Sequence, residues 1–259
     1  MQHSTGFIVM FAAAICVVCS IFVSGSAVLL KDRQLENKIL DRQTKVLDVA
    51  GLVEEGQSLS RAQVLELFEK NIEAVVVDLE SGDVAEGVDA QSFDQARAAK
   101  DPAQSKEAPE NDAKVRRIPN QALVYQVKQE GKVSMVILPV EGKGLWSTLY
   151  GFVAIDADGN TIRGLTFYQH AETPGLGGEV DNPSWKALWP GRKAFDSSWQ
   201  PVIEVKKGAA GPAAEDPHHV DGLSGATLTS RGVTHLLRFW LGEHGFGPYM
   251  AKFRGQHAG

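Results

Sequence analysis

A run of glycines, hydroxyl side chains and one carboxylate, residues 221–230, is the part of this chain best equipped for chemistry. Apolar residues follow it at helical spacing: Val233, Leu236, Leu237, Trp240 and Leu241. The run should therefore end where the free N–H groups and the positive dipole end of a helix lie. Such a place stabilises an anionic group, a phosphate above all, without needing a lysine.

Simpler interpretations of the same run are a capped loop or another known motif. Ser and Thr before a helix often only cap it. A serine-hydrolase elbow requires glycine where Ala226 stands, and a P-loop requires a Gly-Lys pair that the run lacks. The helix cap thus stays open as an alternative to phosphate binding.

Two further segments carry side chains suited to a planar ligand. Residues 170–178 contain three glycines and Pro174, so backbone N–H groups there could approach a ring closely, although a plain turn is the alternative. Residues 144–151 place Leu145 and Trp146 beside two hydroxyls, although a tryptophan near a strand is often simply core. Lys206 and Lys207 follow a short strand-like segment and suit either an anionic ligand or a solvated strand end.

The elements that must position these segments are mostly strands. Residues 123–127 and 133–140 flank a turn at 129–131, and residues 149–155 and 161–168 flank a turn at 156–160, which predicts two hairpins. A capping-box helix from Ser60 to Lys70, a strand over 72–79, a short helix over 183–189 and a strand over 201–205 are expected around them. The predicted fold class is α+β, a curved antiparallel sheet with packed helices.

The N-terminal stretch 7–30 holds no charged residue and is long enough to cross a bilayer as one helix. A signal peptide is the alternative, but no Lys or Arg precedes the apolar run. We expect a transmembrane anchor at 7–30 and one domain over 31–259, with residues 84–114 as an exposed insertion or mobile loop. The basic residues after the helix are mixed with acidic ones, so charge alone does not fix the orientation.

Composition excludes several function classes. With 26 basic and 32 acidic residues the net charge is −6, which argues against a nucleic-acid surface. The only cysteines, Cys16 and Cys19, lie in the apolar stretch, and no spacing of His, Cys and carboxylates predicts a metal site. The chain also lacks a dinucleotide-binding Gly-x-Gly-x-x-Gly unit and a cysteine set for an iron–sulfur cluster.

Three segments in order resemble the FMN-binding domain family: Gly-Leu-Trp at 144–146, Glu-Thr-Pro-Gly-Leu-Gly at 172–177 and Asp-Gly-x-Ser-Gly-Ala-Thr at 221–227. In that family a flavin transferase joins FMN through its phosphate to the motif's threonine, which is Thr227 here. The resemblance implies these further FMN-binding residues: Asp221, Ser224, Gly225, Ala226, Leu145, Trp146, Ser147, Thr148, Glu172, Thr173, Gly175, Leu176 and Lys206.

Taken with the N-terminal anchor, the whole chain resembles the family of C-type subunits of sodium-translocating NADH:quinone oxidoreductases. That resemblance implies an electron-relay subunit in the bacterial inner membrane, with a periplasmic domain, inactive alone and dependent on other membrane, flavin and iron–sulfur subunits. Two alternatives stay open: the homologous flavoprotein subunit of the Rnf electron-transport complex, and an anchored binding module without redox function. Covalently bound flavin would separate the last from the others.

Overall fold

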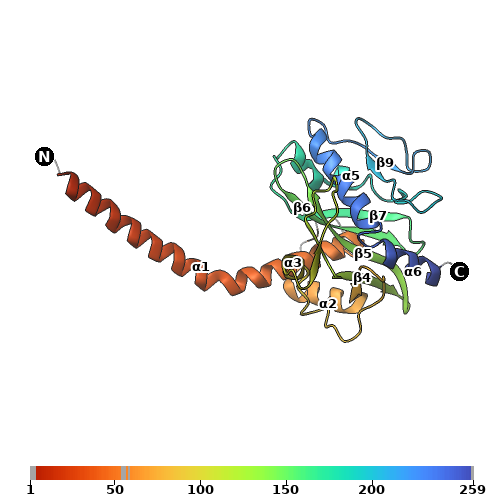
Figure 1. Ribbon diagram of the computed structural model, residues 1–259, viewed down its shortest axis with the longest axis horizontal. Helices are drawn as coiled ribbons and strands as arrows, with labels where there is room; N and C mark the ends of the chain where they lie inside the picture. Colours follow the sequence, from red (N-terminus) through yellow and green to blue (C-terminus); the bar gives the residue numbers. More distant parts are fainter. Residues whose placement is uncertain (1–3, 54–56, 58, 258–259) are drawn as a thin grey trace. The chain divides into compact units, whose positions relative to one another are not determined.

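The computed structural model describes residues 4–53, 57 and 59–257 (Figure 1), and it divides into two units, Met1–Arg42 and Gln43–Gly259. The described part of the first unit is almost wholly helical and belongs to α1 (Thr5–Val49). The apolar side chains of α1 are exposed from Phe7 to Ile39, whereas Val46, Leu47 and Val49 near its end are buried. By length and composition α1 is able to cross a membrane. It continues without a break to Val49, so the helix that contains the apolar stretch also supplies the first element of the folded unit.

The folded unit is built on a five-stranded antiparallel sheet in the order β1-β4-β5-β6-β7. The strands are β1 (Ile72–Asp78), β4 (Gln121–Gln129), β5 (Lys132–Lys143), β6 (Thr148–Asp156) and β7 (Ile162–Gln169). Both predicted hairpins are present. The β4–β5 loop consists of Glu130 and Gly131, both at positive φ, which is the backbone that a two-residue hairpin requires. This architecture confirms the predicted α+β fold class.

Helices cover both faces of the sheet. On one face lie α5 (Thr227–Leu241) and α6 (Gly247–His257) (Figure 1). Their buried side chains share a core with those of β4 to β7. On the other face, α2 (Arg61–Asn71) places Phe68 edge-on against Tyr125 at 6.0 Å between ring centroids. The end of α1 packs there too, because a side chain added at Gly164 would touch Val49. The capping box predicted for α2 is formed by Ser60 and Gln63.

Smaller elements connect these layers: α3 (Gln95–Lys100), β2 (Ser105–Glu107), β3 (Arg117–Pro119), η1 (Gly177–Asp181), α4 (Pro183–Lys186), β8 (Glu204–Val205) and β9 (His219–Val220). The strand expected over 201–205 is thus only two residues long, and it pairs with β9 in parallel. The helix α6 was not predicted.

Residues 84–114 are more ordered than the predicted exposed insertion or mobile loop. They contain α3 and β2, and they bury Ala98, Ser105 and Ala113. The Gln95 side chain accepts a hydrogen bond from the backbone N–H of Leu123 at 2.9 Å, which ties α3 to β4. Single buried side chains hold this segment, so it has no periodic apolar pattern that sequence analysis could detect.

Helix α5 approaches the sheet closely at Gly142 of β5. A Cβ atom added there would lie 2.5 Å from the Cβ of Leu236 and 3.4 Å from the carbonyl oxygen of Ala113. Neither neighbour is the end of a flexible side chain, so a larger residue must push α5 away from β5. The absence of a side chain at Gly142 therefore sets the distance between α5 and the sheet.

We predict that Gly142→Ala lowers the free energy of unfolding by about 1 to 3 kcal/mol through overpacking. Chemical denaturation of the detergent-solubilised chain measures this. Gly255→Ala in α6 is the matched control, because nothing lies within 4 Å of its added Cβ and alanine favours a helix. Equal stability of the Gly142→Ala and wild-type chains would contradict this account of the α5–β5 contact.

Candidate functional site

Thr227 is the first residue of α5, as the sequence pattern predicts, and its side chain is exposed. The N-cap residue is Ala226, and no side chain caps the helix. Within the described part of the chain the Thr227 hydroxyl has no hydrogen-bond partner. The capping role that the sequence left open for this run is therefore not observed, and the hydroxyl lies free at the positive end of a 15-residue helix.

Neighbouring hydroxyls in the run are engaged in holding the structure. The Ser230 Oγ accepts a hydrogen bond from the backbone N–H of Leu223 at 3.0 Å, which folds the motif back over the first turn of α5. Thr229 is completely buried, and its hydroxyl donates to the Glu172 carboxylate at 2.7 Å. Ser224 is exposed like Thr227. The hydroxyls of Ser224 and Thr227 are thus accessible, whereas those of Thr229 and Ser230 hold the structure.

Glu172 joins the first turn of α5 to the loop between β5 and β6. Its carboxylate accepts hydrogen bonds from the backbone N–H groups of Leu145 at 3.1 Å, Trp146 at 2.9 Å and Ser147 at 3.1 Å, in addition to the Thr229 hydroxyl. Only 5% of the residue is exposed. Three successive amides and the hydroxyls of Thr229 and Ser147 therefore surround a buried negative charge.

These donors decide the ionisation of Glu172. Burial, the largest single influence, would raise its pKa by penalising the charged form. The hydrogen bonds from Thr229 and from the amides of residues 145–147 outweigh burial, and they hold the pKa of Glu172 below the ordinary glutamate value. The carboxylate is therefore charged at neutral pH although it is buried.

Two glycines leave room for this carboxylate, and a third lets α5 approach the base of the same loop. A Cβ atom at Gly144 would lie 2.6 Å from Glu172 Oε1, and one at Gly177 would lie 2.6 Å from Thr229 Oγ1 and 2.7 Å from Glu172 Oε2. A Cβ at Gly232 would lie 2.3 Å from the carbonyl oxygen of Lys143, at the base of the same loop. Two of the three sequence segments, together with Gly232 of α5, thus contribute glycines to one close packing arrangement.

The loop that Glu172 holds presents apolar side chains to solvent. Trp146 is 67% exposed and Leu145 is 40% exposed, although both are large and apolar. Leu176 is likewise exposed and lies against the 221–227 run, since a Cβ at Gly225 would approach its Cδ2 to 2.9 Å. Leu228, next to Thr227, is exposed as well. The three segments therefore meet, and large apolar side chains remain uncovered near Thr227.

Some predicted site residues have structural partners instead. Glu172, expected to bind a ligand, uses its carboxylate on backbone amides. The Asp221 carboxylate, expected among the FMN-binding residues, accepts from the backbone N–H of Ala210 at 2.8 Å. Lys206 forms an ion pair with Asp216 at 3.4 Å. Local sequence did not disclose these partners, because they lie 10 or more residues away.

Other predicted residues shape the loops. The Thr173 carbonyl accepts from the backbone N–H groups of Leu176 at 3.1 Å and Gly178 at 2.9 Å, and Gly175 has a φ of +75°. The Ser147 hydroxyl accepts from the backbone N–H of Ala171 at 2.8 Å, and Thr148 begins β6. Thr229 was not singled out from the sequence as a site residue, because its partner Glu172 is 57 positions away. Within the described residues, no three His, Cys, Asp or Glu side chains gather in a way suited to a metal ion.

Comparison with known proteins agrees with this geometry. Residues 144–242, which include all three segments, match the model of the FMN-binding domain family. The crystal structure of Shewanella oneidensis NqrC has a TM-score of 0.78 to this chain at 36% identity, covering 85% of this chain and 99% of that one. The C-type subunit of the Parabacteroides distasonis Na(+)-translocating NADH-quinone reductase has a TM-score of 0.65 at 29% identity, covering 85% of this chain and 96% of that one.

Similarity to curated relatives extends along almost the whole chain. The C-type subunit of the Na(+)-translocating NADH-quinone reductase of Vibrio anguillarum is 52% identical over 93% of this chain and 92% of its own length. The corresponding subunit of Pseudomonas aeruginosa is 49% identical over 98% of this chain and 97% of its own length. With such identity, and with the FMN-binding segments assembled around Glu172, the chain belongs to the NqrC family, the C-type subunits of Na(+)-translocating NADH-quinone reductases.

Proposed function

We propose that this chain carries one FMN, joined by a phosphoester to the Thr227 hydroxyl, and relays electrons within a membrane-bound Na(+)-translocating NADH-quinone reductase. The observation that carries the proposal is the state of Thr227: exposed, first in α5, and without a hydrogen-bond partner in the described part of the chain. A phosphate bound there faces the free N–H groups at the start of α5. Ser224 is also exposed, but it precedes the helix.

The surroundings of Thr227 fit the rest of an FMN molecule. Leu145, Trp146 and Leu176 offer exposed apolar and aromatic surface on two neighbouring loops, and such surface suits a planar isoalloxazine ring. Glu172 keeps the first of these loops in place relative to α5. When bound, the flavin supplies the redox chemistry, whereas the protein supplies position, hydrogen bonds and local polarity.

Attachment requires a second protein. A phosphoester forms when the Thr227 Oγ1 attacks the flavin phosphorus, loses its proton and displaces a leaving group. A flavin transferase acting on an activated flavin phosphate would supply that leaving group. The attached chain would then gain the mass of FMN less one water.

The remaining steps of the reaction belong to partners. NADH oxidation, iron–sulfur transfer, sodium translocation and quinone reduction would occur on other subunits, because this sequence has no dinucleotide-binding motif and only two cysteines, both within α1. We place α1 in the bacterial inner membrane and the folded unit in the periplasm. Support for this placement comes from the apolar α1 and from membership of the family.

We predict that Thr227→Ala abolishes covalent flavin and leaves the fold intact. The free energy of unfolding should change by less than about 0.5 kcal/mol, because Thr227 is exposed and caps nothing. Flavin fluorescence in a denaturing gel and the intact mass of the chain measure the attachment. The control is Ser224→Ala, which removes the other exposed hydroxyl of the run and should keep full flavin. Flavin retained by the Thr227→Ala chain would refute the assignment.

We predict that the transferase recognises the 221–227 run by the charge of Asp221 and by the backbone shape at Gly225. Asp221→Asn keeps an acceptor for the Ala210 N–H but removes the charge, so flavin incorporation should fall while the melting temperature stays unchanged. Gly225→Val should block attachment more strongly, because a Cβ at φ +70° is strained and meets Leu176. Full incorporation in both variants, measured by mass, would show that this recognition model is wrong.

We predict that the Glu172–Thr229 bond orders the flavin environment without taking part in attachment. Thr229→Val keeps the shape of the side chain but removes the hydroxyl, which should cost about 1.5 to 3 kcal/mol of unfolding free energy. Flavin should stay attached, with altered visible circular dichroism and fluorescence. Thr229→Ser retains a hydroxyl and should restore the wild-type signals. An unchanged flavin spectrum in the Thr229→Val chain would argue against this role.

The lowered pKa of Glu172 adds a pH dependence to the same prediction. The stabilisation from its charged form is complete above the ordinary glutamate pKa of about 4.3 and is lost as the pH falls towards the lowered folded-state value. Glu172→Gln removes this contribution. The free energy of unfolding, measured by denaturation from neutral to acidic pH, should therefore fall less steeply with pH for the variant than for the wild type. The same pH dependence in both chains would contradict the assignment.

A further inference from the structure

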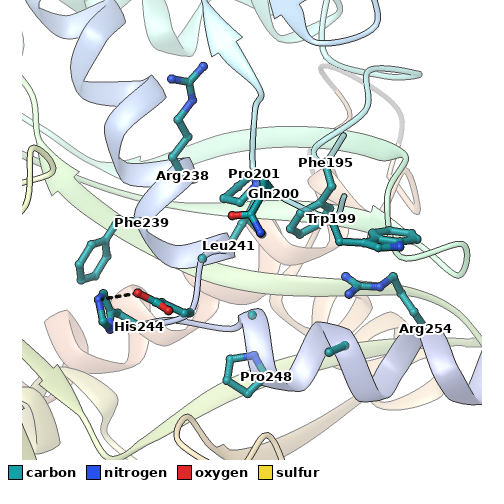
Figure 2. Close-up of a pocket in the computed structure, with 14 residues that line it drawn as sticks. Phe195, Trp199, Gln200, Pro201, Arg238, Phe239, Leu241, His244, Pro248 and Arg254 are labelled. Atoms are coloured by element: carbon teal, nitrogen blue, oxygen red, sulfur yellow. Dashed lines mark ion pairs between the residues drawn. The ribbon is translucent and has the colours of Figure 1, made fainter. Parts of the chain in front are cut away.

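A groove of about 570 Å³ lies where α5 ends and α6 begins (Figure 2). Phe195, Trp199, Pro201, Phe239 and Pro248 give it aromatic and proline walls, and Arg254 lies beneath the indole of Trp199. Its volume is in the range of sites that hold a small ligand or a short peptide segment. None of the three flavin-related segments contributes to it.

The backbone that presents Trp199 is held in an unfavourable conformation. Trp199 has a φ of +59°, which is uncommon for a bulky residue, and the residue is 43% exposed. Asp196 enforces this turn, because its Oδ1 accepts the backbone N–H groups of Ser198 at 2.8 Å and Gln200 at 2.9 Å. Strain maintained in order to expose a large aromatic side chain is typical of binding sites.

Arg254 is fixed in the groove but has no acidic partner there. Its aliphatic stem crosses Gly159, where an added Cβ would meet it, and its guanidinium carbon lies 3.8 Å from the centroid of the Trp199 ring. Among the described residues no carboxylate pairs with it. Cation–π stacking orients the guanidinium but does not neutralise it, so its N–H edge can still bind a carboxylate.

The second arginine of the groove already has partners. Arg238 pairs with Glu204 at 2.9 Å and donates to the backbone carbonyls of Val202 and Ile203. Glu243 lies 3.3 Å from the ring nitrogen of His244. Among the described residues that line the groove, Arg254 is thus the arginine without an acidic partner.

We propose that this groove docks a carboxylate-bearing segment of another subunit of the complex. An aspartate or glutamate side chain would pair with Arg254, while adjacent apolar groups of the segment would cover Trp199 and the proline walls. Exposed tryptophan and arginine are the residue types that contribute most to protein interfaces. Family membership supplies the setting, since the relatives are subunits of a larger reductase.

This docking site does not depend on the proposed flavin attachment. Thr227 begins α5 and Leu241 ends it, which separates the two ends by about 22 Å at 1.5 Å per residue. Substitutions in the groove should therefore leave flavin incorporation unchanged. A variant that loses assembly but keeps its flavin concerns the groove. A variant that loses its flavin but still assembles concerns the attachment site, so the two proposals can be tested separately.

The first test measures assembly of the whole complex, purified from membranes through a tag on a different subunit. Arg254→Met keeps the stem over Gly159 but removes the charge, and Trp199→Gly removes the indole while suiting the positive φ. We expect each to reduce the amount of this chain retained by about tenfold or more, the effect of losing 1.4 kcal/mol of interaction. Arg116→Met, at an exposed arginine outside the groove, should have no effect. Wild-type retention of both groove variants overturns the proposal.

The second test identifies the occupant even where a substitution impairs folding. A photo-crosslinking amino acid replaces the exposed Ala251, which lines the groove, and the intact complex is irradiated in membranes. We expect a crosslink to an Asp- or Glu-containing segment of another subunit, identified by mass spectrometry, and none from the same probe at Arg116. A crosslink to lipid or to a second copy of this chain, or no crosslink at all, overturns the proposal.

Discussion

The buried carboxylate of Glu172 is the interaction on which the candidate site depends. A charge with so little exposure is costly unless donors surround it, and here three successive backbone amides and the Thr229 hydroxyl do so. The amides belong to the β5–β6 loop and the Thr229 hydroxyl belongs to α5. If the loop moved relative to α5, the buried carboxylate would lose hydrogen-bond donors. The loop that carries Trp146 is therefore held rigidly against the helix that begins at Thr227.

This constraint accounts for three glycines near the site. Gly144 and Gly177 lie so close to Glu172 that a Cβ atom would displace its carboxylate, and Gly232 lets α5 approach the end of β5. At these positions glycine provides clearance. At Gly225 and Gly175 it provides a positive φ instead. One residue type thus serves two physical needs within a single site.

Sequence periodicity predicted the elements but not their side-chain partners. Apolar alternation located β4 to β7, and helical spacing located α5, because burial of a regular face leaves a regular pattern. The hydrogen-bond partners of Glu172 and Asp221 were not predictable, since each carboxylate binds backbone amides of a distant loop. Every residue except proline has a backbone amide, so the sequence does not indicate which amides a carboxylate will bind. The helix α6 escaped detection because the glycines and polar residues at 242–248 and 254–257 obscure its short apolar face.

The two ends of α5 have different physical characters. At its start, hydroxyls and free N–H groups meet uncovered leucine and tryptophan side chains, a combination that suits a phosphate joined to a flat ring. At its end, a strained Trp199 and an unpaired Arg254 meet proline walls, a combination that suits a peptide carboxylate. Between them α5 is buried against β5, so it is a rigid spacer. A relay subunit needs such a spacer, because electron transfer requires the cofactor to stay at a fixed distance from whatever the subunit docks against.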